Sequence, residues 1–147
     1  MGVYEGLGRI SAILFYENKD KGNYGNLCHC AGKYIVEINT LHSLEEQIKT
    51  LIHEAFHLAM PFFNNRNIFY RVPVPNEEDR LLVIEEEAEI ERLTDEVYVC
   101  QPILVDYLRR VISYRANNVI GNGIYSLSFR TCFIPSPREY INSPARI

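Results

Sequence analysis

The chain is short of the features that mark exported, membrane-spanning or disulfide-linked proteins. No apolar run in its 147 residues approaches the ~20 that span a bilayer, so we expect no membrane insertion. Residues 1–6 (MGVYEG) lack a basic start followed by an apolar stretch, which predicts no secretory signal and a cytoplasmic location. The four cysteines match no disulfide framework expected of a cytosolic chain of this size.

Internal repeats, low-complexity tracts and linkers are also missing. Apolar residues make up 47% of the chain and charged residues 23%, which is the balance of an ordinary globular domain. We therefore predict a single domain over residues 1–147. Its core is expected at residues 9–100, and a C-terminal helix and arm at residues 101–147.

The net charge of −4 is unevenly distributed. Residues 1–97 carry 9 Lys and Arg against 17 Asp and Glu, whereas residues 98–147 carry 6 Arg against 2 acids. A basic end on an acidic body could contact nucleic acid or an acidic partner. The simpler interpretation is that Arg109, Arg110 and Arg115 form a solvated helix face, so a nucleic-acid partner is only weakly supported.

Two segments have the apolar, β-branched composition of strands. They are residues 9–16 (RISAILFY) and residues 33–39 (KYIVEIN), the second of which alternates between apolar and polar positions. Residues 18–26 between them are rich in Gly, Asn, Asp and Lys, which is typical of a turn. We expect the two strands to pair as a small antiparallel sheet.

The helical patterns complete the prediction of an α+β fold. Ser43 and Glu46 form a capping box, and the apolar stripe that follows should end at Pro61. Residues 61–79 should form a long loop. Further helices are predicted over residues 80–100 and 103–116, and a late strand or extended arm over residues 124–134.

The first predicted helix carries an HExxH motif at its centre, formed by His53, Glu54 and His57. Residues four apart lie on one helix face, so the two imidazoles can converge on one metal ion. Glu54 is rotated by ~100° from His53 and can reach a metal-bound water without being a ligand. This arrangement predicts a Zn²⁺ site in which Glu54 is the catalytic general base.

A third ligand is expected from the acidic second helix, because no histidine follows at the metzincin spacing. Glu86 falls on the apolar stripe, whereas Glu85 faces solvent. Glu87 lies on the border between core and solvent, where a ligand belongs, so we favour Glu87 as the third ligand. Glu91, one turn on, would orient a histidine ring. Glu91, Glu86 and Glu85 remain alternatives for the ligand itself.

These residues resemble the minimal gluzincins, most closely the ImmA/IrrE-like metallopeptidases, with SprT-like proteases as more distant relatives. The resemblance covers residues 9–100 and is carried by residues 33–60 (KYIVEINTLHSLEEQIKTLIHEAFHLAM) and by the acidic helix. It implies a zincin-like fold, in which a small antiparallel sheet packs on the HExxH helix and a second metal helix. It also implies zinc ligands at His53, His57 and Glu87, with a specific protein or peptide as substrate.

Other signals are weaker. Cys28, His29 and Cys30 could form a second metal site, but no further CxxC pair completes four ligands, so buried thiols are the simpler interpretation. Ten tyrosines offer donors for a developing oxyanion, and Tyr70, Tyr98 and Tyr107 are candidates among which the sequence does not choose. The predicted function is a zinc metallopeptidase. The alternative is a non-enzymatic module with a structural zinc, whose phosphate contacts would come from arginines: Arg109, Arg110, Arg115 and Arg130.

Overall fold

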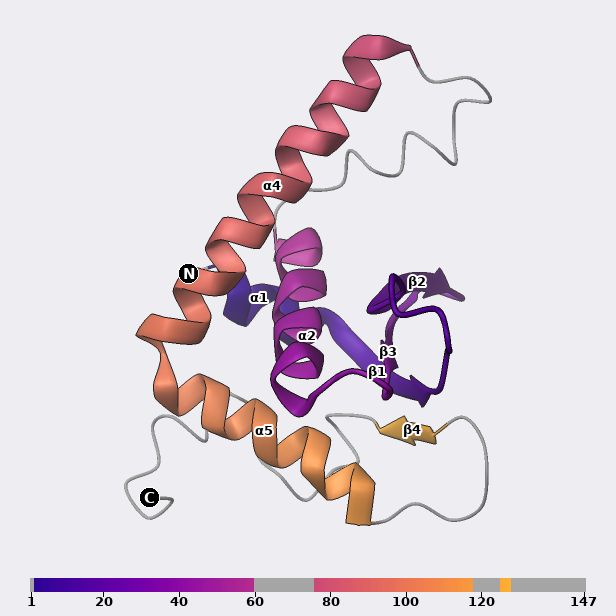
Figure 1. The fold of residues 1–147 in the computed structure, drawn as a ribbon, viewed down its shortest axis with the longest axis vertical. Coiled ribbons are helices and arrows are strands. Elements are labelled where there is room, and N and C mark those ends of the chain that lie inside the picture. The colour runs from indigo at the N-terminus through magenta and orange to yellow at the C-terminus, as the bar shows by residue number, and fades with distance from the viewer. Residues whose placement is uncertain (1, 60–75, 118–124, 128–147) are drawn as a thin grey trace.

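The computed structural model describes residues 2–59, 76–117 and 125–127. These residues form an α+β fold, as the sequence predicts (Figure 1). In chain order the elements are α1 (Gly2–Arg9), β1 (Ile10–Tyr16), β2 (Gly25–Cys30), β3 (Lys33–Asn39), α2 (Leu44–Ala59), α4 (Glu77–Cys100), α5 (Pro102–Asn117) and β4 (Tyr125–Leu127).

The sheet is mixed, with the strand order β2-β3-β1-β4. β1 runs parallel to β3, with Ile13 opposite Val36, whereas β2 pairs antiparallel with β3 and β4 pairs antiparallel with β1. The expected antiparallel pairing of residues 9–16 with 33–39 is therefore wrong. The cause is β2, which was not predicted: only its first two residues fall in the predicted turn over residues 18–26, and it adds one more reversal of the chain.

That reversal is a tight hairpin between β2 and β3. Its two connecting residues both have positive φ, 52° at Ala31 and 75° at Gly32. Positive φ at both central positions matches the right-handed twist of paired strands. The chain thus turns once before β2 and once after it, so β3 returns in the direction of β1.

Helix α1 was not predicted, and it packs against α2. Val3 and Leu7 of α1 are fully buried. Between them Gly6 lies so close to the backbone of Ala55 that a Cβ atom would overlap the Ala55 carbonyl group. The absence of a side chain at Gly6 is therefore what lets the two helices approach.

Helix α2 is the centre of the fold. It begins after Ser43, whose Oγ accepts a hydrogen bond from the Glu46 backbone N–H at 3.2 Å, as the capping prediction required. It contacts α1, α4 and α5 and the strands β2 and β3. In Figure 1, α2 lies between the sheet and the long helix α4. Its apolar side chains supply much of the core, including Ile48, Leu51 and Ile52.

The two later helices begin and end close to the predicted residues. Asn76 caps α4 by accepting a hydrogen bond from the Asp79 backbone N–H at 2.8 Å, so α4 begins three residues before the predicted start. Pro102 opens α5, where its missing N–H costs no intrahelical bond. None of the described helices has the length and apolar character that crossing a bilayer requires.

The predicted C-terminal strand and the long loop are only partly described. Of the predicted strand over 124–134, residues 125–127 form β4, and residues 128–134 lie outside the described residues. Residues 61–75 of the predicted loop, with its aromatic side chains, also lie outside them.

The side chain of Asn39 ties the end of β3 to the loop between β1 and β2. Asn39 is fully buried. Its amide group donates to the carbonyl oxygens of Asn18 at 2.9 Å and Asn23 at 2.7 Å. Its Oδ1 accepts from the backbone N–H groups of Asn18 at 3.0 Å and Leu41 at 3.2 Å. This loop forms one wall of the cleft described below.

Candidate metal centre

The two histidines of the HExxH motif lie one turn apart on α2, on the side that faces α4. Their Nε2 atoms are 3.3 Å apart, and the ring centroids are 5.0 Å apart with a 58° angle between the planes. His57 is fully buried, whereas the side chain of His53 is 23% exposed. One ring is thus held inside the protein and the other borders the cleft.

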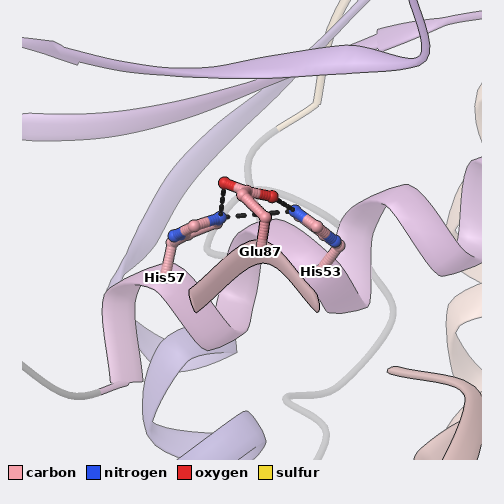
Figure 2. A group of neighbouring side chains, drawn as sticks. All are labelled: His53, His57 and Glu87. Carbon is pink, nitrogen blue, oxygen red and sulfur yellow. Dashed lines mark hydrogen bonds and ion pairs between the residues drawn. The ribbon is translucent and has the colours of Figure 1, made fainter. Parts of the chain in front are cut away.

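Glu87 reaches both rings from α4. Its Oε2 lies 2.8 Å from His53 Nε2, and its Oε1 lies 2.9 Å from His57 Nε2. Figure 2 shows the carboxylate spanning the two imidazoles, with α2 supplying both histidines. One ligand atom from each of these three residues lies within 4.8 Å of the others, so the group could hold a metal ion.

The electrostatics of Glu87 follow from these contacts. Partial burial raises the pKa of its carboxyl group, but hydrogen bonds and charge interactions with His53 and His57 outweigh this effect. The pKa of Glu87 is therefore held well below its usual range. Glu87 stays ionised at any physiological pH, which is the form in which a carboxylate binds a metal.

Glu86 lies against the same histidine from the other side. Its Oε1 is 3.3 Å from His57 Nδ1, and its side chain is only 4% exposed. The sequence placed Glu86 on the core face of α4, where it was only an alternative for the third ligand. A carboxylate on an apolar stripe was the signal that could have identified it, because buried carboxylates require partners.

The remaining glutamates of α4 lie further from the rings. Glu85 and Glu89 are exposed, as expected, and Glu89 forms an ion pair with Arg92 at 2.7 Å. Glu91 is exposed and lines the cleft. The ring-orienting role assigned to Glu91 stays a prediction, and the contact with a histidine Nδ1 favours Glu86 for that role.

The group formed by His53, His57 and Glu87 opens onto a cleft of about 780 Å³. Its walls come from the β1–β2 loop, the polar face of α2 and the facing side of α4. Glu54 is largely buried, with 5% of its surface exposed, and lines this cleft together with His53 and Glu87. The carboxylate predicted as general base therefore borders the same space as two of the predicted ligands.

Other candidate residues lie elsewhere. His29 stacks on Tyr34 in the sheet with centroids 4.5 Å apart, Cys28 is half-buried, and the Cys30 side chain is outside the described residues. Tyr107 is fully buried in the core, away from the residues that line the cleft. The ring centroid of Tyr98 lies 5.0 Å from the Lys49 ammonium, and Tyr70 lies outside the described residues.

Two of the four arginines of the alternative hypothesis have described side chains. Arg110 on α5 pairs with Asp106 at 3.2 Å, one turn earlier on the same helix, and Arg109 is partly exposed. This fits a solvated helix face. The side chains of Arg115 and Arg130 lie outside the described residues.

Comparisons with known proteins add no assignment. No family model, no curated protein and no solved structure matches the chain. The resemblance to the ImmA/IrrE-like group therefore stays a prediction, and the arguments that follow depend on the geometry of the site.

Proposed function

We propose that the chain is a zinc-dependent metallopeptidase of the gluzincin type with a zincin-like fold. The observation that carries the proposal is the convergence of two imidazole nitrogens and one carboxylate from separate helices beside a buried glutamate in a cleft. His53, His57 and Glu87 would hold the zinc ion. Glu54 would be the general base.

The donor set supports zinc among the common metals. Two imidazoles with one carboxylate form the His₂Glu set of catalytic zinc sites, which keep a fourth position for water or substrate. Calcium and magnesium prefer sites made of oxygen ligands, so two nitrogen donors argue against both. Bound zinc polarises the carbonyl of the peptide bond and lowers the pKa of a coordinated water to about 7.

Glu54 is suited to moving the proton. It follows His53 directly, so its side chain leaves α2 ~100° away from the ligand face and still borders the cleft. A carboxylate there can accept a proton from the attacking water and donate it to the leaving amine. Its burial keeps bulk water from replacing it in either transfer.

The cleft supports a peptide as substrate. A volume of about 780 Å³ between the β1–β2 loop, α2 and α4 can accept a short extended segment. The resemblance to ImmA/IrrE-like enzymes favours a specific protein substrate, which would present such a segment to the cleft.

Metal content and cleavage of labelled casein would test the proposal in the wild type, Glu54→Gln and Glu45→Gln. Glu45 lies in the first turn of the same helix, is exposed and is not among the residues that line the cleft, so it is the matched control. We expect about one zinc per chain in all three proteins, with cleavage lost only in Glu54→Gln. A wild type without zinc, or cleavage that survives in Glu54→Gln, would contradict the proposal.

A further inference from the structure

His57 is in contact with two consecutive glutamates of α4, one at each ring nitrogen. Glu87 Oε1 lies 2.9 Å from Nε2, and Glu86 Oε1 lies 3.3 Å from Nδ1. Consecutive residues of a helix point ~100° apart, so the two carboxylates approach the imidazole from different directions. A carboxylate oxygen therefore lies near each ring nitrogen, and the contact at Nδ1 is an ion-pair distance without hydrogen-bond geometry.

The burial of Glu86 is what makes this contact informative. Its side chain is 4% exposed, and its neighbours on the same stripe, Val83 and Ile90, are buried apolar residues. Moving a carboxylate out of water into such surroundings costs several kcal/mol unless polar groups compensate. A carboxylate at this position is therefore expected to have a role that an apolar side chain could not perform.

We infer that Glu86 is a positioning residue for the metal: with an ion at His57 Nε2, Glu86 would accept the proton of His57 Nδ1–H and so present the Nε2 lone pair to the ion. A metal-binding histidine needs its other ring nitrogen protonated and held, which fixes both the tautomer and the orientation of the ring. His57 is fully buried, so bulk water is excluded from this task and a protein group must perform it. The inference rests on the metal binding proposed above, and it does not depend on peptide hydrolysis.

The two histidines differ in their access to solvent. The side chain of His53 is 23% exposed and borders the cleft, so solvent can reach it. Glu86 therefore acts on the ligand that is out of reach of solvent. A purely structural carboxylate between α2 and α4 would stabilise the fold in the same way, and the test must separate the two roles.

The experiment compares full-length Glu86→Met, Glu86→Gln and the exposed-site control Glu85→Gln. Zinc affinity is measured by competition with a chromophoric chelator, and the His57 tautomer is read from the imidazole ¹⁵N shifts of the zinc-loaded protein. We expect a loss of ~10–100-fold in affinity for Glu86→Met, the range typical of such partners. Glu86→Gln should lose less, because its amide oxygen can still accept the proton, and Glu85→Gln should match the wild type.

The inference is overturned if Glu86→Met and Glu86→Gln both bind zinc within about twofold of the wild type, or if the His57 ¹⁵N shifts are the same in Glu86→Gln, Glu86→Met and wild type. If Glu86→Met does not fold, the affinity and shifts of the nearly isosteric Glu86→Gln decide alone. A wild type that binds no zinc overturns both this inference and the proposed function. A wild type that binds zinc but cleaves nothing overturns only the proposed function.

Discussion

The close contact between α1 and α2 leads to a quantitative prediction for Gly6→Ala. A methyl group at Gly6 would overlap the carbonyl oxygen of Ala55 and lie 3.0 Å from its Cα. Backbone atoms cannot rotate aside as a side chain can, so α1 must move away from α2. This movement would loosen the packing of Val3 and Leu7, both of which are buried at the interface.

The size of the effect follows from opposing contributions. Overpacking of this kind costs ~1–3 kcal/mol, and contact with backbone places Gly6→Ala at the upper end. Alanine recovers up to about 1 kcal/mol of helix propensity. We expect a net loss of roughly 2 kcal/mol in the free energy of unfolding, or about 4–8 °C in Tm for a chain of this size.

Gly8→Ala is the matched control, because a Cβ atom at Gly8 meets nothing within 4 Å. This variant should gain about 0.5–1 kcal/mol from helix propensity alone. Urea unfolding followed by circular dichroism, with chelator present to remove any bound metal, measures both changes as shifts in midpoint at constant m. The reasoning is refuted if Gly6→Ala is as stable as the wild type or as Gly8→Ala.

Three further predictions concern the proposed site. Glu87→Ala should weaken zinc binding by roughly 10²–10³-fold, because a zinc-binding free energy of ~10–16 kcal/mol divided among four ligands gives about 3 kcal/mol for each. Glu85→Ala should change the affinity little, and equal losses in a competition titration would refute the assignment of Glu87 as the ligand. His53 and His57 hold the pKa of the Glu87 carboxyl group below its usual range, so the stabilisation from these contacts is present above the usual pKa of a glutamate, ~4.3, and is lost as the pH falls below it; acid unfolding of the metal-free protein that is the same in the wild type and Glu87→Gln would contradict this. Among the described residues that line the cleft, six are carboxylates and one is lysine, so peptides with Lys or Arg beside the scissile bond should show higher kcat/KM than Glu-rich ones. The preference should shrink with salt and in Glu91→Gln, and equal kcat/KM values would refute it.

The parts of the fold that local chemistry determines were predictable from the sequence. The helix that begins after Ser43 depends on its N-cap and on its apolar stripe, and both features can be recognised in the sequence alone. The same holds for α5, which Pro102 opens. Glu87 was selected because its position on the predicted helix, at the border of core and solvent, is visible in the sequence, and the structure places it beside His53 and His57.

The parts that depend on contacts distant in sequence were not predictable. α1 contains three glycines in GVYEGLGR, a poor helix composition, and forms because α2 receives it at Gly6. β2 (GNLCHC) has no strong strand pattern and forms by pairing with β3. The direction of β1 relative to β3 could not be inferred once β2 was overlooked. The contact of Glu86 with His57 Nδ1 was missed because it depends on how α4 packs on α2, and a position on the apolar stripe favoured a place in the core.

The amide group of Asn39 has a consequence for how substitutions at this position would be interpreted. Both of its N–H donors and both lone pairs of its oxygen are used, so the buried site needs two donors and two acceptors from one side chain. Aspartate offers acceptors alone and would turn a negative charge toward two carbonyl oxygens, while leucine would remove one hydrogen bond from each of two N–H groups and two carbonyls. A survey of every substitution in the chain should therefore find Asn39 nearly as intolerant as the histidines of HExxH. Intolerance at this residue would reflect the shape of the cleft wall, and it should not be mistaken for participation in chemistry.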